Sequence, residues 1–169
     1  MRGIVILLKV LNSTQSSTLK RRVRMVKVIN LDFDGYWREV NKSGIPARSG
    51  VYAVYVCQYN EPKEEGSKGT VTLNKLIYIG EAEDVNDRIS NHEKWPEWRK
   101  EVPEGSEICF SFAGVTSPDR ERAECALIFY HKPRYNDECK DAFPYEDTTV
   151  NSSGKHSFIE SSITVQKTT

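Results

Sequence analysis

The segment Gly50-Val51-Tyr52-Ala53-Val54-Tyr55-Val56-Cys57 is a continuous run of β-branched and aromatic residues that opens on a glycine. This composition favours a strand that is buried on at least one face. A second run of the same kind, Leu76-Ile77-Tyr78-Ile79-Gly80, follows a charged loop that contains Glu61 to Gly69. Two strands this close in the chain predict a hairpin with a long connection.

Three further elements are expected downstream of this hairpin. Asp84 can cap a helix over residues 85–94, which Pro96 ends or redirects. Residues 108–115 have the alternation of a third strand. A second helix is expected from Ser117-Pro118 to about Tyr130, because a proline in the first turn is favourable and Pro133 disfavours helical geometry just before it.

The two ends of the chain have polar compositions. Residues 1–24 hold six basic and no acidic side chains, and we expect them to form a poorly ordered leader, with Met25 as an alternative start. The folded domain is expected over residues 25–150. Residues 151–169 are expected to form a polar tail with a short strand near residues 157–165.

Charge restricts how this protein can bind a polyanion. The whole chain of 169 residues has 24 basic and 24 acidic side chains, so residues 25–169 carry 18 basic and 24 acidic groups once the leader is set aside. A body with a net charge of −6 repels nucleic acid at long range. Contact with nucleic acid would therefore need a local basic patch, the leader or a metal ion.

Apolar runs and cysteines indicate the compartment. The longest apolar run, Ile4 to Leu8, is too short to cross a bilayer and is not followed by the pattern of a cleavage site. We therefore expect a cytoplasmic protein without membrane contact. The four cysteines lie far apart without a C-x-x-C pair, which predicts reduced, mostly buried thiols and no structural zinc: Cys57, Cys109, Cys125 and Cys139.

Arg88 and His92 lie four residues apart on the first expected helix. This spacing places both side chains on one face, from which they can contact the same ligand. The alternative is an ordinary solvated helix face with loosely paired charges. Trp95 and Trp98 likewise suit either a platform that stacks on bases or ordinary packing.

Glu124 is expected on the apolar side of the second helix, because Leu127 and Ile128 follow at three and four residues' spacing. A partly buried carboxylate must be paired, protonated or bound to a cation. The pairing alternatives are Arg88, Arg120 and Arg122. The cation alternative suits Mg²⁺, which takes one or two protein carboxylates and keeps several waters.

The order of these residues resembles that of the GIY-YIG endonuclease family. The matching residues are, in chain order, Gly50-Val51-Tyr52, Tyr78-Ile79-Gly80, Arg88, His92, Glu124, and Pro133 with Asn136. Residues 78–92 are similar to the family's second strand and first helix, and residues 124–136 to its metal-binding helix and the following turn. The resemblance covers about residues 48–137, and five elements in order form a specific signal.

The resemblance implies an α/β (α+β) domain with a small three-stranded antiparallel sheet flanked by helices. It also implies a DNA endonuclease that hydrolyses phosphodiester bonds with one Mg²⁺ or Mn²⁺ ion; RNA is not excluded as the substrate. The implied roles are cation binding by Glu124, water activation by Tyr52 relayed through Tyr78 or His92, charge stabilisation by Arg88, and structural support from Asn136, Gly50 and Gly80.

Two features of this chain differ from the family pattern. Val51 replaces the isoleucine of the first triplet, and residues 58–75 form a longer connection, as in the small restriction-type members. Two other functions are compatible with the sequence. One is a non-catalytic module of the same fold that binds nucleic acid or protein, and the other is a domain without a nucleic-acid partner. The oligomeric state and the recognised DNA sequence are left open.

Overall fold

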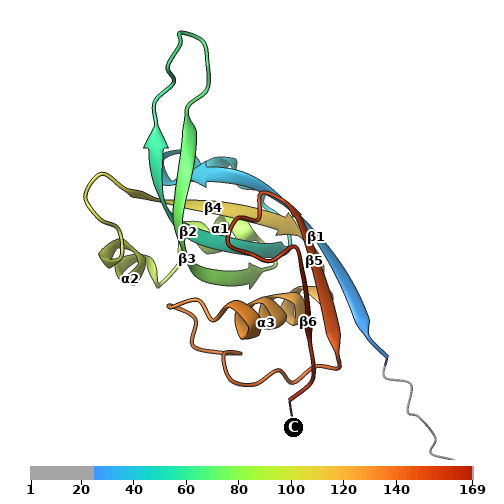
Figure 1. Ribbon diagram of the computed structural model, residues 1–169. Helices are drawn as coiled ribbons and strands as arrows, with labels where there is room; N and C mark the ends of the chain where they lie inside the picture. Colours follow the sequence, from blue (N-terminus) through green and yellow to red (C-terminus); the bar gives the residue numbers. More distant parts are fainter. Residues whose placement is uncertain (1–24, 169) are drawn as a thin grey trace, which may run out of the picture.

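The computed structural model describes residues 25–168, and its main feature is one mixed sheet of six strands that curls into a half-barrel (Figure 1). The strand order is β3-β2-β4-β1-β5-β6. The elements are β1 (Lys27–Arg38), the 3-10 helix η1 (Glu39–Gly44), β2 (Gly50–Asn60), β3 (Thr70–Ala82), α1 (Val85–Ser90), α2 (Trp95–Lys100), β4 (Glu107–Gly114), α3 (Asp119–His131), β5 (Thr148–Gly154) and β6 (Ser162–Val165).

The expected three-stranded sheet flanked by helices is wrong, because β1, β5 and β6 extend the sheet on the far side of β4. β1 pairs with β4 in the antiparallel sense and with β5 in the parallel sense. Ile29, Leu31 and Phe33 of β1 are buried, whereas the residues between them are exposed. This alternation is the signal of a strand with one buried face, and it is present in the sequence.

The central hairpin is confirmed and is longer than predicted. β2 and β3 pair in the antiparallel sense, with Tyr52 opposite Gly80 and Asn60 opposite Thr70. The far end of this hairpin extends away from the sheet as a two-stranded arm (Figure 1). β3 is the edge strand of the sheet, so any site beside it is open on one side.

The first predicted helix, over residues 85–94, is shorter than expected, and a second short helix lies beyond it. α1 ends at Ser90, and α2 begins at Trp95 with Pro96 in its first turn. The backbone N–H of Lys94 donates to His92 Nδ1, which stabilises the turn between the two helices. The predicted strand over 108–115 and the helix ending near Tyr130 are confirmed as β4 and α3, each within one or two residues.

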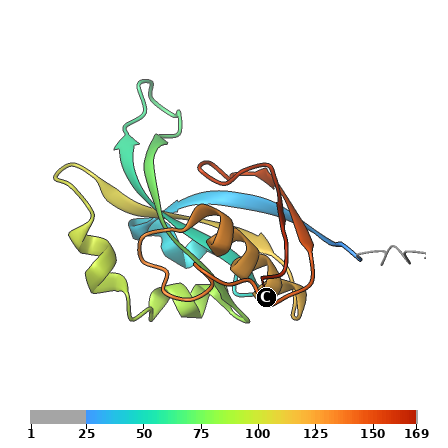
Figure 2. The same cartoon turned by 60° about the horizontal axis from the view of Figure 1, so that its bottom comes forward.

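Helices cover both faces of the sheet (Figure 2). Along β2, Tyr52, Val54 and Val56 belong to the apolar core shared with α1 and α2. Val51, Ala53 and Tyr55 belong to the core shared with α3. Because β3 is the edge strand, groups from both layers can meet beside it.

The C-terminal residues belong to the sheet. The boundary expected at residue 150 falls inside β5, and Ile163 and Val165 of β6 are buried in the core beneath α3. Residues 1–24, expected to be a leader, lie outside the described residues. Between residues 25 and 168, no helix is both long and apolar enough to cross a bilayer.

The expectation of four reduced thiols is wrong for two of them. Cys125 of α3 and Cys139 of the following loop form a disulfide, whereas Cys57 and Cys109 are free and buried. The two bonded cysteines are 14 residues apart in the sequence, and the turn after α3 returns the loop to the helix. Spacing in the sequence does not show this return.

Candidate functional site

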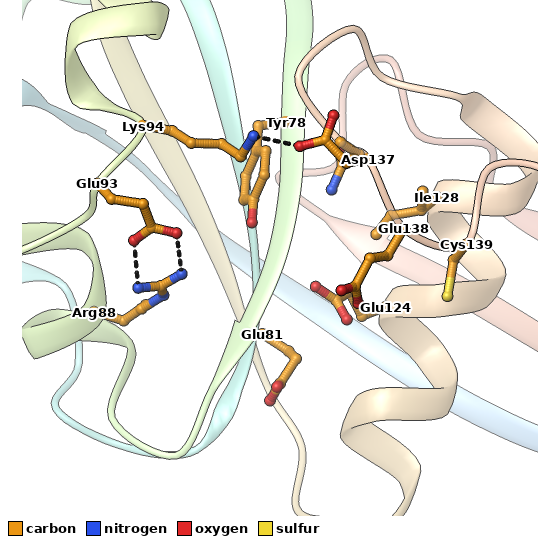
Figure 3. Close-up of a pocket in the computed structure, with 11 residues that line it drawn as sticks. Tyr78, Glu81, Arg88, Glu93, Lys94, Glu124, Ile128, Asp137, Glu138 and Cys139 are labelled. Atoms are coloured by element: carbon orange, nitrogen blue, oxygen red, sulfur yellow. Dashed lines mark hydrogen bonds and ion pairs between the residues drawn. The ribbon is translucent and has the colours of Figure 1, made fainter.

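A cavity of about 420 Å³ lies beside β3, between the segment of α1 and α2 and the segment of α3 (Figure 3). Its lining residues are Tyr78, Glu81, Arg88, Glu93, Lys94, Glu124, Ile128, Asn136, Asp137, Glu138 and Cys139. Four of the residues predicted from the sequence are among them. These are Tyr78, Arg88, Glu124 and Asn136, which come from four separate segments of the chain.

The two tyrosines occupy different depths. Tyr78 lines the cavity, and Figure 3 shows its hydroxyl directed into it. Tyr52 is fully buried, and its ring centroid lies 6.1 Å from that of Tyr78. Burial raises the pKa of Tyr78 to about 12 and that of Tyr52 well above its ordinary value. Tyr78 is therefore the tyrosine that a ligand in the cavity can contact.

Gly80 makes room for both rings. A Cβ atom at this position would lie 2.4 Å from the hydroxyl of Tyr52 and 2.7 Å from the ring of Tyr78. At Gly50, a Cβ atom would lie 2.3 Å from the carbonyl oxygen of Ala113. A side chain at Gly80 would displace the two tyrosine rings, and one at Gly50 would displace the neighbouring strand β4, so both glycines have a steric role.

Asn136 fixes the edge of β3 from the loop that follows α3. Its Nδ2 donates to the Ile79 carbonyl oxygen at 2.7 Å, and its Oδ1 accepts from the Ile79 N–H at 3.0 Å. One residue earlier, the Tyr135 N–H donates to the carbonyl oxygen of Ile77. The amide of Asn136 thus pairs with both backbone groups of Ile79 as a neighbouring strand would, and it holds Tyr78 in position.

Arg88 and His92 do not share one helix face. α1 ends between them, so Arg88 reaches the cavity while His92 is buried against the rings of Tyr78 and Trp98, at 5.2 and 4.4 Å between centroids. Burial, together with the charge of Arg88, lowers the pKa of His92 to about 4. His92 is therefore neutral at physiological pH. Its Nδ1 accepts a hydrogen bond from the Lys94 N–H, so the proton lies on Nε2.

Trp95 and Trp98 pack in the core of this layer. Both side chains are buried, and their rings contact each other at 5.5 Å between centroids. Trp95 Nε1 donates to the carbonyl oxygen of Ile89. The structure therefore favours the packing alternative over a platform that stacks on bases.

Glu124 has no arginine or lysine partner among residues 25–168. Each arginine considered from the sequence has another partner: Arg88 pairs with Glu93, Arg120 pairs with Glu81 and Glu121, and Arg122 lies over the ring of Tyr145. Burial, followed by the negative charges of Glu81, Glu138 and Glu121, raises the pKa of Glu124 to about 8. The carboxyl group therefore lacks a neutralising partner.

This environment fits a cation. Glu124 is a partly buried carboxylate beside further acidic groups, and a positive charge would offset their repulsion. Mg²⁺ suits such a site because it accepts few protein ligands. In the part of the chain that the structure describes, no three His, Cys, Asp or Glu side chains are grouped to hold a metal. A cation at Glu124 would therefore take most of its ligands from water and substrate.

Five charged lining residues were not among the sequence-based candidates, and the first of them directly follows Gly80: Glu81, Glu93, Lys94, Asp137 and Glu138. Glu93 and Lys94 follow His92 directly, and Asp137 and Glu138 follow Asn136 directly. Their adjacency to candidate residues was the available signal. No family model, curated protein or solved structure matches this chain.

Proposed function

We propose that this protein is a metal-dependent endonuclease that hydrolyses phosphodiester bonds in DNA. The observation that carries the proposal is the unpaired carboxylate of Glu124, which shares one cavity with Arg88 and Tyr78. Phosphoryl transfer needs positioning and positive charge more than covalent participation by the protein. One cation, one arginine and one proton acceptor supply these needs.

The proposed role of each residue follows from whether its side chain lines the cavity or lies behind the lining. Arg88 donates hydrogen bonds from its guanidinium N–H groups to the phosphoryl oxygens. The planar guanidinium suits this role because it can donate two parallel hydrogen bonds. Tyr78 accepts the proton of the attacking water, because it is the tyrosine that lines the cavity. Tyr52 packs behind Tyr78 and positions its ring. We therefore assign proton acceptance to Tyr78 rather than Tyr52.

Glu124 would hold the divalent cation, Mg²⁺ or Mn²⁺. When bound, such an ion supplies charge for the developing phosphoryl oxyanion and for an ionised tyrosine. Ile128 and the disulfide of Cys139 form the apolar part of the wall beside this carboxylate. This apolar wall lowers the local dielectric constant on one side of the carboxylate, which strengthens its interaction with a cation.

Activity should increase with pH. Glu124, with a pKa of about 8, must lose its proton to hold a cation, and Tyr78, with a pKa of about 12, must lose its proton to act as a base. Both groups gain the required charge as pH rises. The cleavage rate should therefore increase from pH 7 to pH 9, with up to a tenfold gain per unit for each group.

The test is nicking of a supercoiled plasmid in Mg²⁺ or Mn²⁺ by four variants. Glu124→Gln removes the charge at constant shape and should abolish nicking. Arg88→Ala should reduce the rate about 10²- to 10³-fold. Tyr78→Phe should lower the rate about 10²- to 10⁴-fold, whereas Tyr52→Phe should lower it less. Absence of nicking by the wild-type protein, or equal nicking by wild type and Glu124→Gln, would refute the proposal.

One observation favours a second function, a nucleic-acid-binding module without catalysis. Arg88, which the nuclease needs, is held by Glu93 through two hydrogen bonds. This alternative predicts DNA binding that needs no divalent cation, is unchanged in Glu124→Gln, and is accompanied by no nicking under any metal condition. Measuring binding and nicking on the same samples separates the two functions.

A further inference from the structure

We propose that Lys94 is a second phosphate-binding residue beside Arg88, and that Glu93 and Asp137 occupy the phosphate positions in the free protein. This inference rests on the proposed function, because the phosphates are those of DNA in the same cavity. It assigns Lys94 to substrate binding and makes the two carboxylates internal competitors of the substrate. Four observations support it.

The first observation is the geometry of Arg88 and Glu93. Arg88 Nη1 and Nη2 donate to the two carboxylate oxygens of Glu93 at 2.7 and 2.8 Å (Figure 3). A phosphate presents two oxygens to a guanidinium in the same parallel arrangement. The Glu93 carboxylate therefore occupies the place and geometry that a phosphate needs to bind Arg88.

The second observation is the ion pair between Lys94 and Asp137 at 2.7 Å, which joins opposite sides of the cavity (Figure 3). Lys94 belongs to the turn before α2, and Asp137 belongs to the loop after α3. Only 18% of the Lys94 side chain is exposed, so its ammonium group is held at the cavity, whereas 80% of Asp137 is exposed. Lys94 Nζ also lies 3.9 Å from Glu97 of α2, so the ammonium group stays beside α2 when the exposed carboxylate of Asp137 leaves.

The third observation is the charge of the cavity. Arg88 and Lys94 are the two basic residues of its lining, and acidic residues outnumber them: Glu81, Glu93, Glu124, Asp137 and Glu138. A polyanion cannot be attracted to this lining as it stands. It can enter if a phosphate takes the place of Glu93 on Arg88 and another takes the place of Asp137 on Lys94, which turns both carboxylates outward.

The fourth observation is that both carboxylates can be released into water. Glu93 is 62% exposed in its pair, and Asp137 is 80% exposed. Water and salt screen the pair of Lys94 with Asp137, so releasing Asp137 should weaken DNA binding no more than about fivefold. Glu93 is held more firmly, because its two hydrogen bonds with Arg88 lower its pKa to about 2, and it should be the stronger competitor.

Binding is tested without cleavage, by fluorescence anisotropy of a labelled 30-base-pair duplex in EDTA at several KCl concentrations. Glu93→Gln and Asp137→Asn should each tighten binding about two- to fivefold, because the competitor is removed. Lys94→Gln should weaken binding. It should also make the negative slope of log K against log[KCl] shallower by about 0.9, the value for one phosphate contact. Equal melting temperatures of all variants check that each is folded.

Two controls separate exchange from a general change in charge. Glu146→Gln removes an exposed acidic group that pairs with Lys167 outside the cavity, and it should change affinity less than Glu93→Gln does. The gain from Glu93→Gln should disappear in an Arg88→Gln background, and the gain from Asp137→Asn should disappear in a Lys94→Gln background.

The outcomes are separable from those of the proposed function. This inference is overturned if the gains in DNA affinity from the two carboxylate variants persist in the Arg88→Gln and Lys94→Gln backgrounds. It is also overturned if Lys94→Gln does not change DNA binding. Either result leaves the nuclease proposal standing. Absence of DNA binding by the wild type and by Glu93→Gln/Asp137→Asn overturns both. Coupled gains together with an absence of nicking support phosphate exchange and overturn the nuclease proposal.

Discussion

Glu124 illustrates how one carboxyl group can be placed where its charge is unfavourable. It lies on the side of α3 that faces the cavity, with acidic neighbours and without an arginine or lysine partner among residues 25–168. A group of this kind lowers stability when it is ionised and free of ligand. The same property gives it affinity for a cation, so stability and ligand binding can be tested on one residue.

The pH dependence of stability is the direct test of this placement. In the folded protein the pKa of Glu124 is about 8, above its ordinary value of 4.5. The unfolded chain therefore releases this proton at lower pH than the folded chain does, and the free energy of unfolding should fall between about pH 4.5 and pH 8. Glu124→Gln lacks this titrating group, so its free energy of unfolding should not show the decrease that is due to Glu124.

The measurement is urea denaturation of both proteins in EDTA at pH 5 and pH 8. The advantage of Glu124→Gln over the wild type should be larger at pH 8, and Mn²⁺ at pH 8 should stabilise the wild type selectively. Identical pH profiles for the two proteins would show that Glu124 is not buried in the way described.

Asn136 provides a second prediction at the scale of a residue. Asn136→Ala leaves the N–H and carbonyl groups of Ile79 without their side-chain partners and should lower the free energy of unfolding by about 2–4 kcal/mol. Asn60→Ala is the matched control, because Asn60 also makes two hydrogen bonds through its amide but is exposed on the hairpin. Urea denaturation should show a loss below about 1 kcal/mol for the control, and equal losses would contradict the role given to Asn136.

At the scale of elements, the segment after α3 carries much of the cavity wall. It contains Asn136, Asp137 and Glu138, and its end is attached to α3 by the bond between Cys125 and Cys139. The residues before these cysteines are Glu124 and Glu138, which both line the cavity. The disulfide therefore holds the two acidic side chains on the same wall.

Reduction of this bond should destabilise the protein. A crosslink that closes a loop of about 15 residues contributes about 3 kcal/mol, so the free energy of unfolding should fall by about this amount in dithiothreitol. Cys139→Ser should match the reduced wild type and should not respond to reductant. Four titratable thiols in the purified unfolded protein without reductant would show that the bond does not form.

At the scale of the whole molecule, the sheet joins distant parts of the chain. β1 lies between β4 and β5, and its parallel pairing with β5 connects residues 27–33 with residues 148–154. β6 then continues the sheet beside β5 and covers the core under α3. The C-terminal residues are thus part of the fold that supports the site, although they contribute no lining residue to the cavity.

A chain that ends at residue 150 should therefore fail to fold cooperatively. It would lose β6, more than half of the β1–β5 pairing and the buried side chains of Ile159, Ile163 and Val165. Thermal melting followed by circular dichroism should show no sharp transition. As point controls in the full chain, Ile163→Ala should cost about 2–5 kcal/mol, whereas its exposed neighbour Thr164→Ala should cost less than about 1 kcal/mol. A sharp transition in the truncated chain would show that residues 25–150 fold independently.

Part of this architecture could be predicted from the sequence. The hairpin of β2 and β3, the strand β4 and the helix α3 follow from local patterns: continuous β-branched runs, alternation and a proline-marked start. The apolar spacing around Glu124 likewise predicted that its carboxylate would be partly buried. These features depend on neighbours within a few residues, and such neighbours determine which face of an element is apolar.

The tertiary structure decided the rest. The parallel pairing of β1 with β5, the disulfide between Cys125 and Cys139, the burial of His92 and the partners of Arg88 and Lys94 all join segments that turns bring together. Sequence patterns specify the apolar face of each strand but do not specify which strand lies beside it. The charge of a side chain is visible in the sequence, but its pKa and its partner depend on burial and on distances set only when the sheet has closed around it.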